Sequence, residues 1–267
     1  TFDFVKSEFK PLLIALLKIA GPVMVLAGIF MGYFLMNIFS LSGDMESGIF
    51  DNGSGEIVSL IIQYFFTIFV AIFSSLMVST VTYSYMYEYK IHGSNVESSV
   101  IWERTKKLLG RIMLIGLVNT FIVMIGLIFF IVPGIYLAIG LALIYPVAVF
   151  EDLTIWESVK RSIYLVRDYW WYTLGGVIVI SLVYGVLSST LSMPASFITM
   201  ILTFLSVESE EGPGLIIKIL QIFASILSTL SYTFYAIQCI WLVLYYYNQV
   251  EVKDEPTLLA KIEQLGN

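Results

Sequence analysis

The stretch 150-FEDLTIWESVKRS-162 is a charged segment in an otherwise apolar part of the chain. Thr154 and Glu157 have the spacing of a capping box. In this motif the hydroxyl binds a free amide of the first helical turn, and the glutamate reaches back to the cap residue. The spacing therefore predicts a helix that begins at Ile155, and we expect it to cover about 155–169.

This expected helix is amphipathic. With about 3.6 residues per turn, apolar side chains form one narrow stripe and charged side chains face the other way. The stripe holds Ile155, Val159, Ile163, Val166 and Trp170. Such a helix is suited to lie along a membrane surface, with Trp170 and Trp171 in the headgroup region.

The composition indicates that lipid surrounds most of the chain. Of its 267 residues, 58% are hydrophobic and only 13% are charged, whereas soluble domains carry about 25% charged residues. Backbone groups in hydrocarbon must be paired internally, and about 20 residues of helix cross a bilayer. We therefore expect an all-α, polytopic membrane helical bundle that forms a single domain over 1–267.

Six apolar segments are long enough to cross a membrane as helices. They lie at about 12–39, 57–87, 112–131, 134–150, 170–205 and 215–247, and a tail follows over 248–267.

Four prolines mark expected turns and kinks. Pro133 and Gly134 predict a tight helical hairpin, because proline lacks a backbone donor and glycine accepts turn geometry. Pro194 lies in the long segment 170–205, which either forms one kinked span or divides into a span plus a short helix. Pro22 and Pro146 are further candidates for kinks.

The distribution of basic residues predicts the orientation of the bundle. If the six spans alternate, 13 of the 14 lysines and arginines fall on one side, and only Lys218 falls on the other. Basic loops stay on the cytoplasmic side of a membrane. We therefore expect a multi-pass protein of the bacterial cytoplasmic (inner) membrane with both termini in the cytoplasm.

A second candidate capping box lies sixty residues before the first. Ser94 and Glu97 have the same spacing and predict a second amphipathic cytoplasmic helix over about 95–111. The two stretches suggest a weak internal repeat. The alternative is two independent loops that share common cap residues.

The central part of the chain resembles a known bacterial family, the membrane portion of some glycerophosphoryl diester phosphodiesterases. The resemblance is densest over about 130–175. It rests on Val132-Pro133-Gly134-Ile135-Tyr136, Pro146, Glu151, Glu157, Arg161-Ser162, Val166 and Trp170-Trp171. It implies a multi-span helical fold. In fused members the phosphodiesterase chemistry belongs to a separate soluble domain, whose residues these 267 do not contain, so that activity is not carried over.

The residue inventory argues against an enzyme. His92 is the only histidine and Cys239 the only cysteine, so we expect no catalytic triad, no metal site and no cofactor. A nucleic-acid partner is not expected either, because no basic cluster is combined with stacking aromatic residues.

Two sets of residues are candidates for contacts with lipids or partners. Basic residues of the expected cytoplasmic face are candidates for binding anionic lipid headgroups: Arg104, Lys106, Lys107, Arg111, Lys160, Arg161 and Arg167. Gly28 and Gly32 have the spacing that allows close helix packing. That packing is either within the chain or with another protein or a second copy.

The sequence thus predicts a non-catalytic subunit or scaffold of a membrane complex. Its partners are membrane lipids together with other proteins or further copies of the chain. The alternative is a transporter or channel for a small solute or lipid, with its site near Pro146 and Pro194, because broken helices in two related halves mark such sites.

Overall fold

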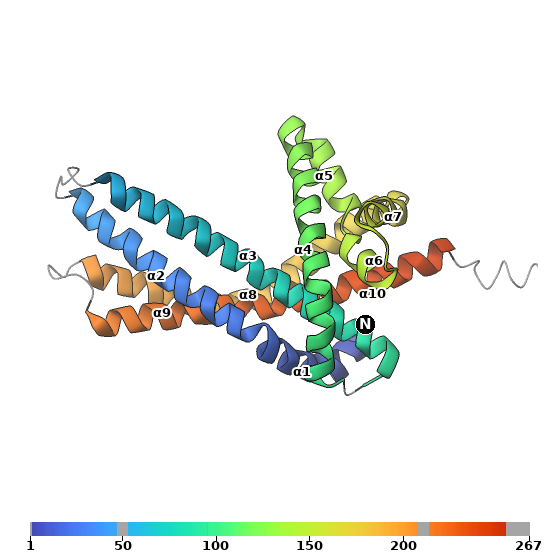
Figure 1. Ribbon diagram of the computed structural model, residues 1–267, viewed down its shortest axis with the longest axis horizontal. Helices are drawn as coiled ribbons and strands as arrows, with labels where there is room; N and C mark the ends of the chain where they lie inside the picture. Colours follow the sequence, from blue (N-terminus) through green and yellow to red (C-terminus); the bar gives the residue numbers. More distant parts are fainter. Residues whose placement is uncertain (1, 47–52, 95, 208–213, 255–267) are drawn as a thin grey trace, which may run out of the picture. The chain divides into compact units, whose positions relative to one another are not determined.

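The computed structural model describes residues 2–46, 53–94, 96–207 and 214–254, and these ranges contain helices and short connections without strands. The helices are α1 (Phe2–Ile19), α2 (Gly21–Glu46), α3 (Gly53–His92), α4 (Ser98–Phe129), α5 (Ile131–Gly140), α6 (Ile144–Phe150), α7 (Ile155–Arg167), α8 (Trp170–Val207), α9 (Leu215–Leu230), the 3-10 helix η1 (Ser231–Phe234) and α10 (Tyr235–Asp254). Figure 1 shows their course along the chain. The prediction of an all-helical chain is confirmed.

Six helical segments of the described residues are long and apolar enough to cross a membrane. They are Gly21–Ile38, Val58–His92, Ser98–Phe129, Ile131–Phe150, Trp170–Leu202 and Leu215–Asp254. Each overlaps one of the six segments that the sequence predicts. The tail predicted at 248–267 is helical in α10 as far as Asp254, and its residues 255–267 lie outside the described part of the chain.

The chain forms two compact units. The first comprises residues 1–12, 79–183 and 236–267, and the second comprises 13–78 and 184–235. The long helices α3 and α8 contribute one end to each unit.

The first unit is built around the end of α3. Residues 79–86 are buried on all sides, as expected for a helix that other helices surround completely. Tyr83 and Tyr85 are among its largest fully buried side chains. Two apolar clusters complete this core, and both combine residues of α6 and α7.

In the second unit α2 packs directly on α9. A Cβ atom at Gly28 would lie 2.5 Å from Cα of Ile226, and one at Gly32 would lie 2.9 Å from Cα of Ile222. The Thr229 hydroxyl donates a hydrogen bond of 2.9 Å across this contact to the carbonyl of Met24. The two glycines therefore serve packing within the chain, which decides between the two alternatives that the sequence leaves open.

The proline positions refine the predicted breaks. The first apolar segment divides into α1 and α2 at Ala20, where Pro22 cannot donate to the carbonyl of Lys18. The fourth divides into α5 and α6 just before Pro146. By contrast, α8 continues through Pro194 as one helix, so the alternative of a span plus a separate short helix is wrong.

The predicted hairpin between the third and fourth segments is confirmed, but its turn lies at Phe130, three residues before Pro133. Phe130 alone separates α4 from α5, with φ −157° and ψ 131°. Pro133 lies in the first turn of α5, where a missing donor costs nothing. Gly134 lets the two helices approach, because a Cβ atom there would lie 2.7 Å from the backbone nitrogen of Leu127.

The helix predicted over 95–111 is not a separate element. α4 begins at Ser98 and continues to Phe129, so this stretch and the third span form one helix. The capping box predicted at Ser94 and Glu97 is wrong. Glu97 itself occupies the cap position without a side-chain cap bond, and its carboxylate accepts a bond of 3.0 Å from the Ser99 hydroxyl.

α7 begins at Ile155 as predicted, but its apolar stripe does not face outward. Val159 and Val166 are buried, and Ile155, Ile163 and Trp170 pack against the same two core clusters. The prediction that this stripe enters the membrane surface is therefore wrong, because α5 and α6 cover it. Sequence periodicity identifies an apolar face but not the surface that covers it.

We predict that Gly28→Ala destabilises the protein by about 1–3 kcal/mol, because the added methyl group must displace the backbone of α9. The measurement is thermal unfolding in mild detergent. Gly185→Ala in α8 is the matched control, since a Cβ atom there meets nothing within 4 Å. Equal unfolding temperatures for the two variants would contradict the close contact.

Candidate functional site

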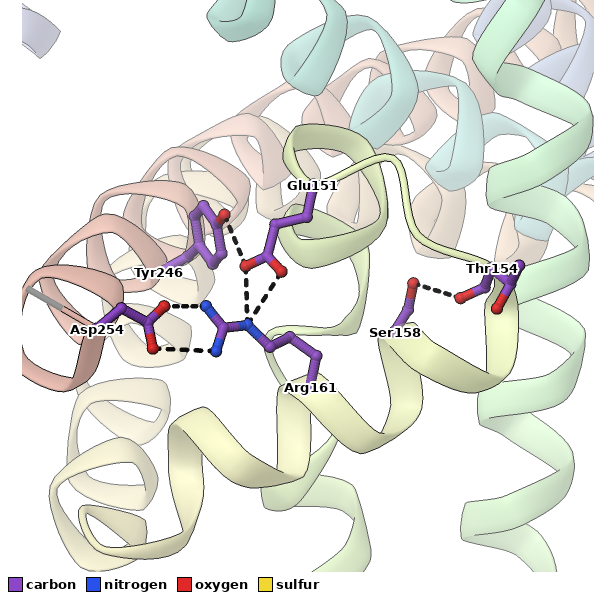
Figure 2. A network of polar contacts seen from close by, with 6 residues as sticks. All are labelled: Glu151, Thr154, Ser158, Arg161, Tyr246 and Asp254. Carbon is purple, nitrogen blue, oxygen red and sulfur yellow. Dashed lines mark hydrogen bonds and ion pairs between the residues drawn. The ribbon is translucent and has the colours of Figure 1, made fainter.

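An ion-pair network in the first unit joins α6, α7 and α10 (Figure 2). The Nε–H of Arg161 donates to both carboxylate oxygens of Glu151 at 3.0 Å. Its two terminal nitrogens donate to the carboxylate of Asp254, one of them at 3.2 Å. The hydroxyl of Tyr246 donates to Glu151 at 3.0 Å. One guanidinium group thus connects α7 with the end of α6 and with Asp254 of α10, which lies 93 positions further along the chain.

The fork shape of arginine explains why this position needs that residue. A guanidinium group offers five donors in one plane and can bind two carboxylates at once, whereas lysine offers a single charged point. Arg161, Glu151 and Asp254 are 22%, 21% and 34% exposed in their side chains. The group is therefore partly shielded from water, which strengthens each bond.

The loop between α6 and α7 is held by a second arginine. Arg111 of α4 donates to the carboxylate of Asp152 and to the carbonyl of Leu153. Asp152 has a φ of 52°, a left-handed conformation that aspartate tolerates better than most residues. The backbone amide of Thr154 then donates to Glu157 at 3.0 Å, and its hydroxyl donates to the same oxygen at 2.6 Å. Each residue from 151 to 154 is thus held in place.

The C-terminal end of α7 is fastened to α10. Lys253 donates to the carboxylate of Asp168 at 2.8 Å and to the carbonyl of Tyr164. Its ammonium group also lies 4.7 Å from the centre of the Tyr164 ring. Together with Arg161, this contact fixes the rotation of α7 about its own axis.

Outside the candidate membrane spans, three groups of this site have shifted pKa values. The hydrogen bonds that Glu157 accepts from Thr154 lower the pKa of Glu157, and the bond that Asp168 accepts from Lys253 lowers the pKa of Asp168. The bond to Asp254 raises the pKa of Arg161. Glu157 and Asp168 stabilise the folded state when they are ionised. This stabilisation is fully present above their unfolded-state pKa values and is lost as the pH falls through their lowered folded-state pKa values.

The opposite face of α7 carries aromatic and basic side chains. Trp156, Lys160, Tyr164 and Arg167 are all exposed, and their spacing of four, four and three residues places them in one stripe. Trp156 and Tyr164 are 60% and 49% exposed. We call these four residues the outer stripe of α7.

The structure separates the seven basic candidates into two sets. Arg104, Lys106, Arg111 and Arg161 form ion pairs with carboxylates. Within the described residues, no ion pair closer than 4 Å is found for the exposed Lys107, Lys160 and Arg167. Two of these three belong to the outer stripe, so the sequence-predicted cluster is not one continuous site.

Sequence reasoning missed two buried carboxylates of the first unit. Glu8 accepts a bond of 2.6 Å from the Tyr85 hydroxyl, and it is 5% exposed. Glu88 is 6% exposed and pairs with Arg104 at 2.9 Å and with His92 at 3.2 Å. Glu88 and His92 are four residues apart on one helix, a spacing that could have indicated their contact. Glu8 and Tyr85 have no such signal.

The remaining candidates for chemistry lie apart. His92 contacts Glu88 near the end of α3, whereas Cys239 is fully buried in α10. Among the residues that the structure describes, no group of three His, Cys, Asp or Glu side chains is placed to hold a metal ion.

Comparison of the chain with protein-family models, with curated proteins and with solved structures found no match. The resemblance of residues 130–175 to a phosphodiesterase membrane domain therefore rests on the quoted residues alone.

We predict that Arg161→Lys lowers the free energy of unfolding by about 1.5–3 kcal/mol, because a lysine cannot keep the bonds to both carboxylates. Thermal unfolding in mild detergent measures the loss. Arg167→Lys, on the outer stripe of the same helix, keeps the charge and serves as the matched control. The network would lose its assigned role if both variants unfolded at the wild-type temperature.

Proposed function

We propose that this chain is a non-catalytic, multi-pass protein of the bacterial cytoplasmic membrane that acts as a subunit or scaffold of a membrane complex. In this proposal the outer stripe of α7 binds the headgroups of anionic lipids on the cytoplasmic side. The observation that carries the proposal is the exposure of Trp156, Lys160, Tyr164 and Arg167 on one face of α7.

The chemistry of the stripe supports lipid contact. Tryptophan and tyrosine favour the boundary between hydrocarbon and water, since one end of each ring system is apolar and the other is polar. Each basic residue near an anionic membrane surface contributes about 1 kcal/mol. Lys160 and Arg167 form no ion pair within 4 Å among the described residues, so their donors are available to phosphate groups.

The apolar surface of the chain supports a position in a bilayer. At the hairpin of α4 and α5, three consecutive apolar residues are largely exposed: Phe130, Ile131 and Val132, with Val132 at 78%. Large exposed apolar patches mark contacts with membranes or partners. The turn of this hairpin lies at the far end of α4 from Arg104 and Lys107, and residues 112–150 contain no charged side chain.

The proposed lipid contact can be tested by native mass spectrometry of protein released from bilayers that contain phosphatidylglycerol. We expect the double variant Lys160→Gln, Arg167→Gln to retain at least about threefold less phosphatidylglycerol than the wild type, because two charges near the surface contribute about 2 kcal/mol before screening. Lys218→Gln, which removes a charge predicted on the other side of the membrane, is the control. Equal retention by the double variant and the wild type would refute lipid binding by the stripe.

The proposed orientation can be tested with reporter fusions. A fluorescent protein fused after residue 267 should fold and fluoresce, because we place the C-terminus in the cytoplasm. Alkaline phosphatase inserted at residue 51 should be active, because we place that loop on the opposite side. The reverse pattern at either position would overturn the orientation without bearing on the helical fold.

A further inference from the structure

The second unit contains a cavity of about 450 Å³ between α2, α3, α8 and α9. This volume lies within the range of about 300–1,000 Å³ that small-molecule sites occupy. All of its lining residues except Phe204 belong to the candidate membrane spans. The cavity is therefore at the level of the apolar segments rather than in a loop.

The lining of the cavity carries no charge. Its apolar part includes Ala27, Met31 and Ala71, and its polar part consists of hydroxyl groups. The hydroxyl of Ser196 donates to the carbonyl of Ser192 at 2.8 Å, and that of Ser225 donates to the carbonyl of Gln221 at 2.9 Å.

These bonds reduce the polarity that the wall offers to a ligand. A serine that donates to the carbonyl four residues earlier on its own helix no longer presents that donor to the cavity. The single donor of the Thr229 hydroxyl is also occupied, because the carbonyls of Met24 on α2 and Ile226 on α9 both lie 2.9 Å from its oxygen. A site for an ion or a chain of water molecules needs several convergent polar groups. The wall fits a hydrocarbon chain better than either.

The cavity is open to the outside beside α8. Met200 and Phe204, which line it, are 55% and 66% exposed. Methionine side chains are unbranched and adapt to irregular apolar shapes. An elongated apolar ligand can thus enter from the surroundings without passing a charged group of the lining.

We propose that this cavity binds one acyl chain of a membrane lipid. The proposal depends on the membrane placement given under Proposed function, because in a bilayer the medium that reaches the opening is hydrocarbon. A void in a packed interior forfeits the dispersion contacts of its lining, so an acyl chain that fills it is stabilised. The hydroxyls of Ser196, Ser225 and Thr229 can keep their carbonyl partners when such a chain is bound.

The test uses a phosphatidylglycerol whose acyl chain carries a diazirine near its end, incorporated into bilayers that contain the full chain. After illumination, mass spectrometry locates the labelled residues. We expect labelling of cavity residues on α2, α8 or α9, and a reduction of at least about fivefold in Ala71→Phe, which fills the cavity. Ile72→Phe, on the exposed face of the same helix, should label like the wild type.

Labelling of exposed apolar residues such as Phe65 and Phe69 separates the two proposals. If these are labelled but the cavity residues are not, the chain lies in the bilayer and the acyl-chain site is refuted. If neither set is labelled, the membrane placement fails, and the acyl-chain site fails with it.

Two further comparisons complete the design. If Ala71→Phe does not fold, Ser196→Phe on the open side of the cavity replaces it, and equal cavity labelling in that variant and the wild type refutes the site.

A free fatty acid with the same diazirine chain identifies the source of the ligand. Stronger cavity labelling by the phospholipid assigns the chain to bilayer lipid, and stronger labelling by the free acid assigns it to a fatty acid; either supports acyl-chain binding.

Discussion

The guanidinium group of Arg161 is the central polar contact of the first unit. It lies between the carboxylates of Glu151 and Asp254, and it thereby ties the end of α6 and the end of α10 to the middle of α7. An ion pair of this kind is stabilising only if its geometry satisfies all partners, because each charge has lost part of its hydration. These contacts fix the rotation of α7 about its own axis, so that its apolar side is buried and its outer stripe is exposed.

Small side chains have two opposite effects in the second unit. Where glycines of α2 face α9, they let the backbones approach until no space remains, and a hydroxyl bonds directly across the contact. Where alanine and serine side chains face one another without such an approach, they leave a cavity. Tight packing thus gives one helix pair its stability, and the cavity gives the proposed lipid chain its place.

Much of the helical framework follows from local sequence. Runs of apolar residues predict the six spans, and Thr154 with Glu157 predicts the start of α7, because capping depends on residues within one turn. The second capping box fails at Ser94 for a related reason: the same residue types occur in loops, and only the backbone conformation decides which of them caps a helix. Pro194 shows the limit of a breaker signal, since α8 continues through it as one helix.

The sequence by itself determined that the chain is helical, where most of its helices lie, and that basic residues gather in particular connections, because these properties depend on near neighbours and on composition. The tertiary structure decided that Arg161 bonds to Asp254, 93 positions away, that the apolar face of α7 is covered by α5 and α6, and that Gly28 meets α9. No pattern along the chain encodes these pairings, since each depends on which surfaces the folded helices bring together. The stretch 150–162 joins both kinds of information: its cap is local, and its arginine is not.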